Sequence, residues 1–167
     1  MKKFAIPLLL LILTALQNSL FEYIKVFGVK PNIVLVFVIC ITLIKGNPLG
    51  TIVGIGGGIL EDIFFQGAFG INSISCMLAA FIIGSVEGKI YKDNVIVPGF
   101  FVFAGTVIKE MIVYLFLYLI RTELDIMTAL TSKIIPEAIY NTILAFLFYR
   151  YIVKFVNKIF AEQAWKY

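Results

Sequence analysis

The chain has 167 residues, of which 61% are hydrophobic and 14% charged, and it contains no histidine. Soluble domains carry about 25% charged residues, so this composition predicts an integral membrane protein. The length accommodates about six membrane-spanning helices of roughly 20 residues, and we expect no soluble catalytic domain beside them. Without histidine the commonest metal ligand and general base are missing, which argues against metal chemistry and histidine-dependent catalysis. No cofactor is expected.

Six apolar segments follow one another along the chain and predict an all-α membrane bundle of six helices. We assign them to a single integral membrane domain over residues 1–167, with helices at approximately 4–21, 29–44, 49–65, 70–86, 95–120 and 134–160. The second segment is short for a span, so we expect its helix either to include Val29 and Lys30 or to lie where the membrane is thin. Residues 121–133 are interpreted as a polar loop.

The distribution of basic residues orients these helices. With both termini in the cytoplasm, nine of the 14 Lys and Arg residues lie on the inner side and four on the outer side, with Lys109 inside the membrane. Because cytoplasmic flanks are enriched in Lys and Arg, this orientation is favoured. The net charge of +4 then reflects topology and not nucleic-acid binding. Arg150, Lys154 and Lys158 form a basic cytoplasmic ridge that serves as a topology signal or attracts anionic membrane lipids.

A glycine-rich face is expected on the helix at 49–65. Gly50, Gly54 and Gly58 recur every fourth residue and therefore share one face of a helix. Each interior glycine weakens a helix in water, but in a bilayer small residues let another helix approach closely. We predict a buried packing helix. Asp62 continues the same face. Exposure of its carboxylate to lipid would cost much free energy, so it must point at protein, water or headgroups.

Polar residues from several helices fall in the same outer third of the predicted bundle. The candidate cluster, a pocket or a partner-docking site, comprises Glu61, Asp62, Asn72, Glu137 and Asn141. Three interpretations remain open: hydrogen bonds between helices, an outward-facing pocket for a small ligand, or a docking surface for a partner.

Two further charges, Lys109 and Glu110, are expected inside the membrane near the middle of the fifth helix. Adjacent side chains on a helix point about 100° apart, so either each finds its own neighbour or one of the two is neutral. A proton or ion relay is the weaker interpretation, because few other titratable groups are expected at that depth.

Three motifs occur in order: Pro31-Asn-Ile-Val-Leu, the stretch from Gly50 to Asp62 followed by Gly67 and Gly70, and Pro136-Glu-Ala-Ile-Tyr-Asn141. Their order and the chain length resemble the bacterial rod-shape-determining MreD family, over essentially the whole chain. The resemblance implies a non-enzymatic component of the bacterial inner membrane, with a fold similar to the S components of energy-coupling-factor vitamin transporters.

The same resemblance implies partners in the cell-elongation machinery that positions peptidoglycan synthesis. These are MreC, a single-span protein with a periplasmic coiled coil, then MreB filaments linked through it, and nearby the glycosyltransferase RodA with a class B penicillin-binding protein. No catalytic residues carry over. We hypothesise that Asp62, Glu137 and Asn141 shape the surface near the MreC contact.

Two other functions compete with this interpretation. The chain could itself be an S component, although its first helix lacks the Ala-x-x-x-Ala pattern with which S components dock their coupling partner. An intramembrane enzyme is disfavoured, because the adjacent Glu61 and Asp62 lie on different helix faces and cannot form an aspartyl dyad. Nothing in the spacing supports a catalytic pair of Ser75 and Lys109 either.

Overall fold

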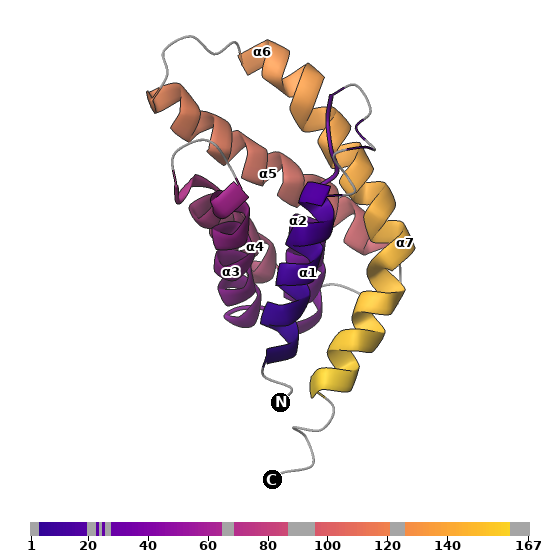
Figure 1. Cartoon of the computed structure of the whole chain (residues 1–167). Coiled ribbons are helices and arrows are strands. Elements are labelled where there is room, and N and C mark those ends of the chain that lie inside the picture. The colour runs from indigo at the N-terminus through magenta and orange to yellow at the C-terminus, as the bar shows by residue number, and fades with distance from the viewer. Residues whose placement is uncertain are drawn as a thin grey trace.

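A computed structural model describes residues 4–19, 23, 25, 28–64, 69–86, 96–120 and 126–160. These residues form helices and no β-strand, which confirms the all-α prediction for the described part of the chain (Figure 1). The elements are α1 (Ala5–Ser19), α2 (Ile33–Lys45), α3 (Leu49–Phe64), α4 (Ile71–Ser85), α5 (Ile96–Ile120), α6 (Ile126–Ala129), the π-helix η2 (Leu130–Ile134) and α7 (Ile135–Phe160). Since α6, η2 and α7 are continuous, the described residues match the six predicted helical segments.

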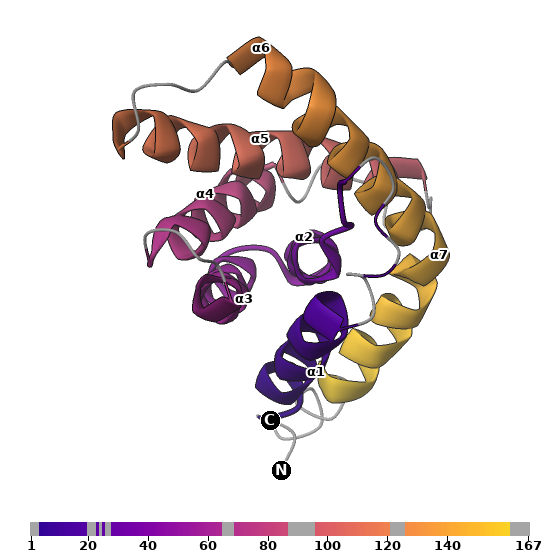
Figure 2. The same cartoon turned by 45° about the horizontal axis from the view of Figure 1, so that its top comes forward.

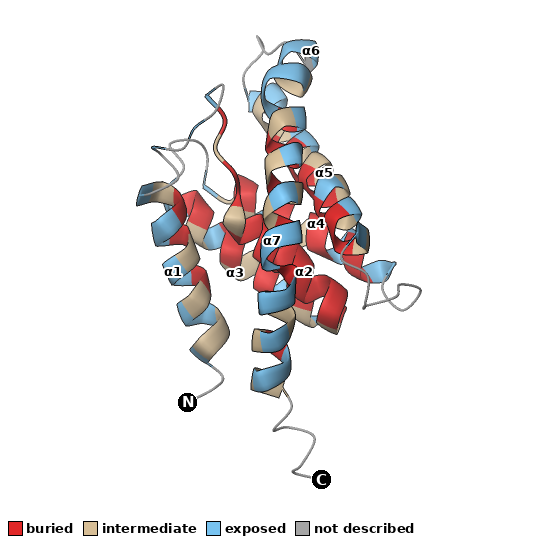
Figure 3. Cartoon of the chain, turned by 90° about the vertical axis from the view of Figure 1, so that its right-hand side faces the viewer, coloured by how far each residue is buried: buried red, intermediate tan, exposed pale blue. Residues whose placement is uncertain are grey.

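Helix α2 is the centre of the bundle. It contacts α1, α3, α4, α5 and α7, and Figure 2 shows it end on among them. Every residue from Val34 to Ile44 is buried, so the helix is red along most of its length in Figure 3. A helix that is apolar on all sides is stable only when it is surrounded. The most hydrophobic segment of the chain therefore became the core.

The structure corrects the predicted start of this central helix. Val29 and Lys30 lie before it, and α2 begins at Ile33 with Asn32 as its N-cap. The Asn32 side-chain oxygen accepts a hydrogen bond from the Leu35 backbone N–H at 2.8 Å, which is the usual reason that asparagine starts a helix. At 1.5 Å per residue the 13 residues of α2 extend only about 20 Å, less than the roughly 30 Å hydrocarbon core of a bilayer.

The predicted polar loop at 121–133 is also corrected. Residues 121–125 lie outside the described residues, but from Ile126 the chain is already helical. The π-helix at Leu130–Ile134 directly precedes Pro136. Proline has no N–H to donate to the carbonyl four residues earlier, so a local widening of the helix at this point relieves the mismatch.

Helices α3 and α4 approach each other through the glycine face. A Cβ atom on Gly54 would lie 2.9 Å from the Cys76 carbonyl oxygen, and one on Gly58 would lie 2.6 Å from the Asn72 carbonyl oxygen, both on α4. Gly50 faces α2 instead, against Thr42. The glycine face thus contacts two neighbouring helices.

The helices differ in their suitability to cross a membrane. Among the described residues, α5 is the one helix with both the length and the apolar composition to span a bilayer, and α1, α2 and α4 are apolar but shorter. The beginning of α1 and the end of α7 lie at the same end of the bundle (Figure 1).

Replacement of Gly58 by alanine should destabilise the bundle by about 1–3 kcal/mol, because the new methyl group would meet the α4 backbone, which cannot rotate away. Gly56→Ala is the matched control on the same helix. Its methyl group would meet only Leu10 Cδ1, at 3.6 Å, and alanine favours helix by about 1 kcal/mol relative to glycine. In thermal unfolding in detergent, Gly58→Ala should have a lower midpoint temperature than the wild type, whereas Gly56→Ala should not. Equal midpoints for the two variants would contradict this packing.

Candidate functional site

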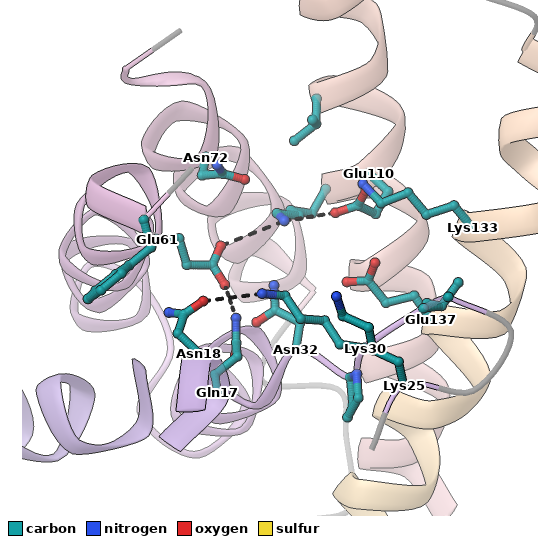
Figure 4. Close-up of a pocket in the computed structure, with 16 residues that line it drawn as sticks. Gln17, Asn18, Lys25, Lys30, Asn32, Glu61, Asn72, Glu110, Lys133 and Glu137 are labelled. Atoms are coloured by element: carbon teal, nitrogen blue, oxygen red, sulfur yellow. Dashed lines mark hydrogen bonds and ion pairs between the residues drawn. The ribbon is translucent and has the colours of Figure 1, made fainter. Parts of the chain in front are cut away.

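A polar cavity of about 280 Å³ lies beyond the amino end of α2 (Figure 4). It is bounded by the end of α1, the segment before α2, the end of α3, the start of α4, the middle of α5 and the start of the α6–α7 segment. The lining residues are Gln17, Asn18, Lys25, Gly28, Val29, Lys30, Pro31, Asn32, Glu61, Phe64, Asn72, Lys109, Glu110, Val113, Lys133 and Glu137. Because the central helix is short, its neighbours extend past it and enclose this space.

The amino end of α2 forms the floor of the cavity and is held by side chains from α1 and α7. Gln17 Oε1 accepts the Val34 N–H at 3.2 Å, and Asn141 Oδ1 accepts the Asn32 N–H at 2.7 Å. Asn141 also donates from Nδ2 to Thr106 Oγ1 on α5 at 3.1 Å. These bonds supply partners to N–H groups that have none inside the helix. Asn141 therefore joins three helices at the floor.

Two lysines and two glutamates form a chain of ion pairs along one wall. Lys109 Nζ lies 2.7 Å from Glu110 Oε1 and 3.6 Å from Glu61 Oε2, and Lys133 Nζ lies 2.8 Å from Glu110 Oε2. Lys109 and Glu110 each have a neighbour of their own, as expected, but the two adjacent side chains also pair with each other, which was not expected. Their side chains are long enough to bend toward each other although their Cα–Cβ bonds diverge.

Asp62 has a different role from the cavity residues. Its carboxylate accepts hydrogen bonds from the backbone N–H groups of Asn72 at 2.9 Å and Ser73 at 3.0 Å, and from the Ser73 hydroxyl. A carboxylate at this position caps the amino end of α4 and is favoured by the helix dipole. Asp62 thus fixes the connection between α3 and α4 and does not line the cavity.

Glu137 enters the cavity from the first turn of α7 and is only 5% exposed. Figure 4 shows its carboxylate directed into the space between the Glu110 wall and the lysines of the segment before α2. Within the described residues the structure contains no hydrogen bond or ion pair of this side chain. It is the exception in a site where the other carboxylates are paired.

The predicted site residues are partly brought together. Of the candidate cluster, Glu61, Asn72 and Glu137 line the cavity, whereas Asp62 and Asn141 are buried beside it. Lys109 and Glu110, predicted separately, lie in the same wall. The basic ridge of Arg150, Lys154 and Lys158 is exposed on the distant half of α7 and is not part of the site.

Six polar lining residues were not named among the predicted site residues: Gln17, Asn18, Lys25, Lys30, Asn32 and Lys133. For Asn32 a signal was available, since asparagine directly before an apolar run is typical of an N-cap. The lysines carried no local signal. They were counted only as charges on the outer side, and the packing that brings them to the cavity is not encoded in their spacing.

The family model for rod shape-determining protein MreD matches residues 1–159. The chain belongs to the MreD family. A search among curated proteins and a search among solved structures gave no match. Membership establishes a role in the determination of rod shape and an association with the membrane. The similarity to S components stays a prediction, because no solved structure tests it.

In the MreD-family structure described here, replacement of Lys109 by methionine should lower stability by about 3–5 kcal/mol, because Glu61 and Glu110 would lose a buried cation. The half-exposed Lys133, with 52% of its side chain accessible, is the control, and Lys133→Met should cost within about 1 kcal/mol. Addition of Glu61→Gln to Lys109→Met should recover part of the loss in thermal unfolding. Similar losses for the two single variants would contradict the inferred charge network.

Proposed function

We propose that this MreD-family protein is a non-enzymatic, multi-pass scaffold of the bacterial inner membrane, which binds MreC directly and helps to position peptidoglycan synthesis. MreB filaments, RodA and a class B penicillin-binding protein are reached through the same complex. The observation that carries the proposal is the family match over residues 1–159. The family is one of shape-determining proteins, and the resemblance noted in the sequence supplies the partners.

A multi-pass arrangement is supported by helices whose polarity is inverted relative to those of soluble proteins. Helix α1 buries Thr14 and Gln17 while it exposes leucines and isoleucines such as Leu8, Leu11 and Ile12. Soluble proteins rarely expose large continuous apolar surfaces. Inside a bilayer, by contrast, polar side chains are directed into the bundle and apolar ones toward the lipid.

The same inversion occurs on α5 and α7. Helix α5 buries Lys109 and Glu110 and exposes Met111 and Leu115. Helix α7 buries Glu137 and Asn141 and exposes its neighbouring isoleucines and leucines, namely Ile139, Ile143 and Leu147. Helices too short to span a bilayer fully are tolerated in such a bundle when other helices or local thinning cover the difference. We infer that the whole bundle is embedded.

We place both termini in the cytoplasm. The start of α1 and the end of α7 lie at one end of the bundle, and the basic ridge of Arg150, Lys154 and Lys158 lies near that end. Lys and Arg are concentrated on cytoplasmic flanks. The cavity at the opposite end then faces outward, toward the compartment that holds the coiled coil of MreC.

Single-cysteine labelling tests this topology. The native Cys40 and Cys76 are both 0% exposed, so an introduced cysteine should dominate the reaction with a membrane-impermeant maleimide. In spheroplasts, Lys133→Cys should react from outside, and Lys158→Cys should react only after permeabilisation. The reverse pattern would invert the orientation, and labelling of both variants from outside would contradict the assignment of both termini.

Affinity purification of the tagged protein from its native membrane, followed by mass spectrometry, tests the scaffold function. We expect recovery of a single-span protein with a coiled coil together with wall-synthesis enzymes, which an unrelated tagged membrane protein should not recover. The cavity favours one alternative, a substrate-binding S component. Recovery of a transmembrane coupling protein with ATPase subunits would establish that alternative and overturn the scaffold.

A further inference from the structure

The cavity contains one carboxylate, that of Glu137, which forms no hydrogen bond or ion pair with another described residue. Lys109 and Lys133 are both engaged by Glu110, and Lys109 also by Glu61, so this group combines two cations with two anions. Glu137 stands outside it, without a hydrogen bond or ion pair among the described residues. A buried carboxylate without a partner is costly and is normally compensated by a cation or by hydrogen-bond donors.

The Glu137 oxygens are accessible from the cavity. Among the described residues, every fully enclosed side-chain nitrogen or oxygen has a hydrogen-bond partner. Because the carboxylate of Glu137 has none, it must contact open space, and Glu137 lines the cavity. Figure 4 shows the carboxylate directed into it. A ligand entering the cavity can therefore reach this group directly.

The surroundings favour an ammonium group over a divalent metal ion. Calcium and similar ions take several oxygen ligands, usually from more than one carboxylate. Here Glu61 and Glu110 are already held by lysines, which leaves a single carboxylate. A protonated primary amine needs one counter-ion and a few acceptors, and the amide side chains of Asn32 and Asn72 line the same space.

The opposite polarity is present elsewhere on the cavity wall. Lys25 and Lys30 line it from the segment before α2, and Lys30 Nζ donates to Asn18 Oδ1 at 3.2 Å. Positive charge on this side favours an anionic group on the ligand. The volume of about 280 Å³ is just below the usual range of ligand pockets, which measure roughly 300–1,000 Å³. The occupant is therefore small.

We propose that this cavity binds a small zwitterion in which a protonated primary amine pairs with Glu137 and a phosphate or carboxylate faces Lys25 and Lys30. The same chemistry occurs in a free amino-phosphate and in an aminophospholipid headgroup. Because the inference rests on the geometry of the cavity alone, it is independent of the contact with MreC.

Calorimetric titration of the purified full chain in detergent tests the proposal with three probes: phosphoethanolamine, ethanolamine and inorganic phosphate. Phosphoethanolamine should bind most tightly. Glu137→Gln should weaken it on the order of 10- to 100-fold, as expected for loss of a charge-assisted hydrogen bond. Lys154→Gln is the control, since it removes an exposed charge from the same helix outside the cavity, and it should leave binding unchanged.

A second experiment distinguishes the two sources. The protein is reconstituted in nanodiscs of mixed phosphatidylethanolamine and phosphatidylcholine, and the lipid that co-purifies after extraction is measured. Enrichment of phosphatidylethanolamine that Glu137→Gln abolishes would identify a lipid headgroup, because the quaternary amine of phosphatidylcholine has no N–H to donate. Binding of phosphoethanolamine without this enrichment would identify a free molecule.

Three results would overturn the proposal. They are binding of none of the probes with no lipid enrichment, unchanged binding by Glu137→Gln, and binding of phosphate as tight as that of phosphoethanolamine. If Glu137→Gln does not fold, the proposal is tested on the wild-type protein by comparing its affinity for ethanolamine with its affinity for the neutral ethylene glycol. Equal behaviour of these two probes would mean that the carboxylate does not select an amine.

Discussion

The structure depends on a central helix that is apolar on every side and too short to cross a bilayer. Since α2 must be surrounded, five other helices pack against it, and since it begins only at Ile33, its amino end lies inside the protein. The first backbone N–H groups of a helix have no partner within it and, when buried, need partners from side chains. Gln17, Asn32 and Asn141 supply them. The polar character of this end of the bundle follows from that requirement.

The charged residues beyond the amino end of α2 are a second consequence of the shortness of this helix. Where α2 is absent, its neighbours enclose a space that apolar side chains do not fill, and ionisable groups from α3, α5 and η2 meet there. Buried charges are tolerated when they pair with one another. Lys109, Glu61, Glu110 and Lys133 do so. Glu137 does not, and this asymmetry gives the cavity its chemical preference.

The two connections that set the shape of the cavity are local devices with physical causes. Between α3 and α4, Asp62 caps the amino end of α4, while Gly54 and Gly58 let the two backbones approach. Before α7, the π-helix accommodates Pro136 and carries Lys133 to Glu110. Both devices hold helix ends in place where the bundle is most polar.

Much of the architecture was determined by the sequence itself, because composition and hydrophobic runs report directly on local structure. The apolar runs predicted six helical segments, the four-residue spacing of Gly50, Gly54 and Gly58 predicted a close-packing face, and the order of motifs indicated the family. Asn32 before an apolar run is a signal for an N-cap, but the predicted helix began earlier, at Val29.

Only the tertiary structure decided which polar groups meet. Sequence spacing gives the direction of a side chain at Cβ, but lysine and glutamate reach several ångströms beyond it, so Lys109 and Glu110 could bend together. The tertiary structure also gave different roles to two adjacent residues: Asp62 caps a helix, whereas Glu61 lines the cavity. Which side chains pair across helices depends on how whole helices pack, and that packing follows from the burial of α2. The burial of α2 is a property of the assembled bundle, so no single segment of the sequence encodes it.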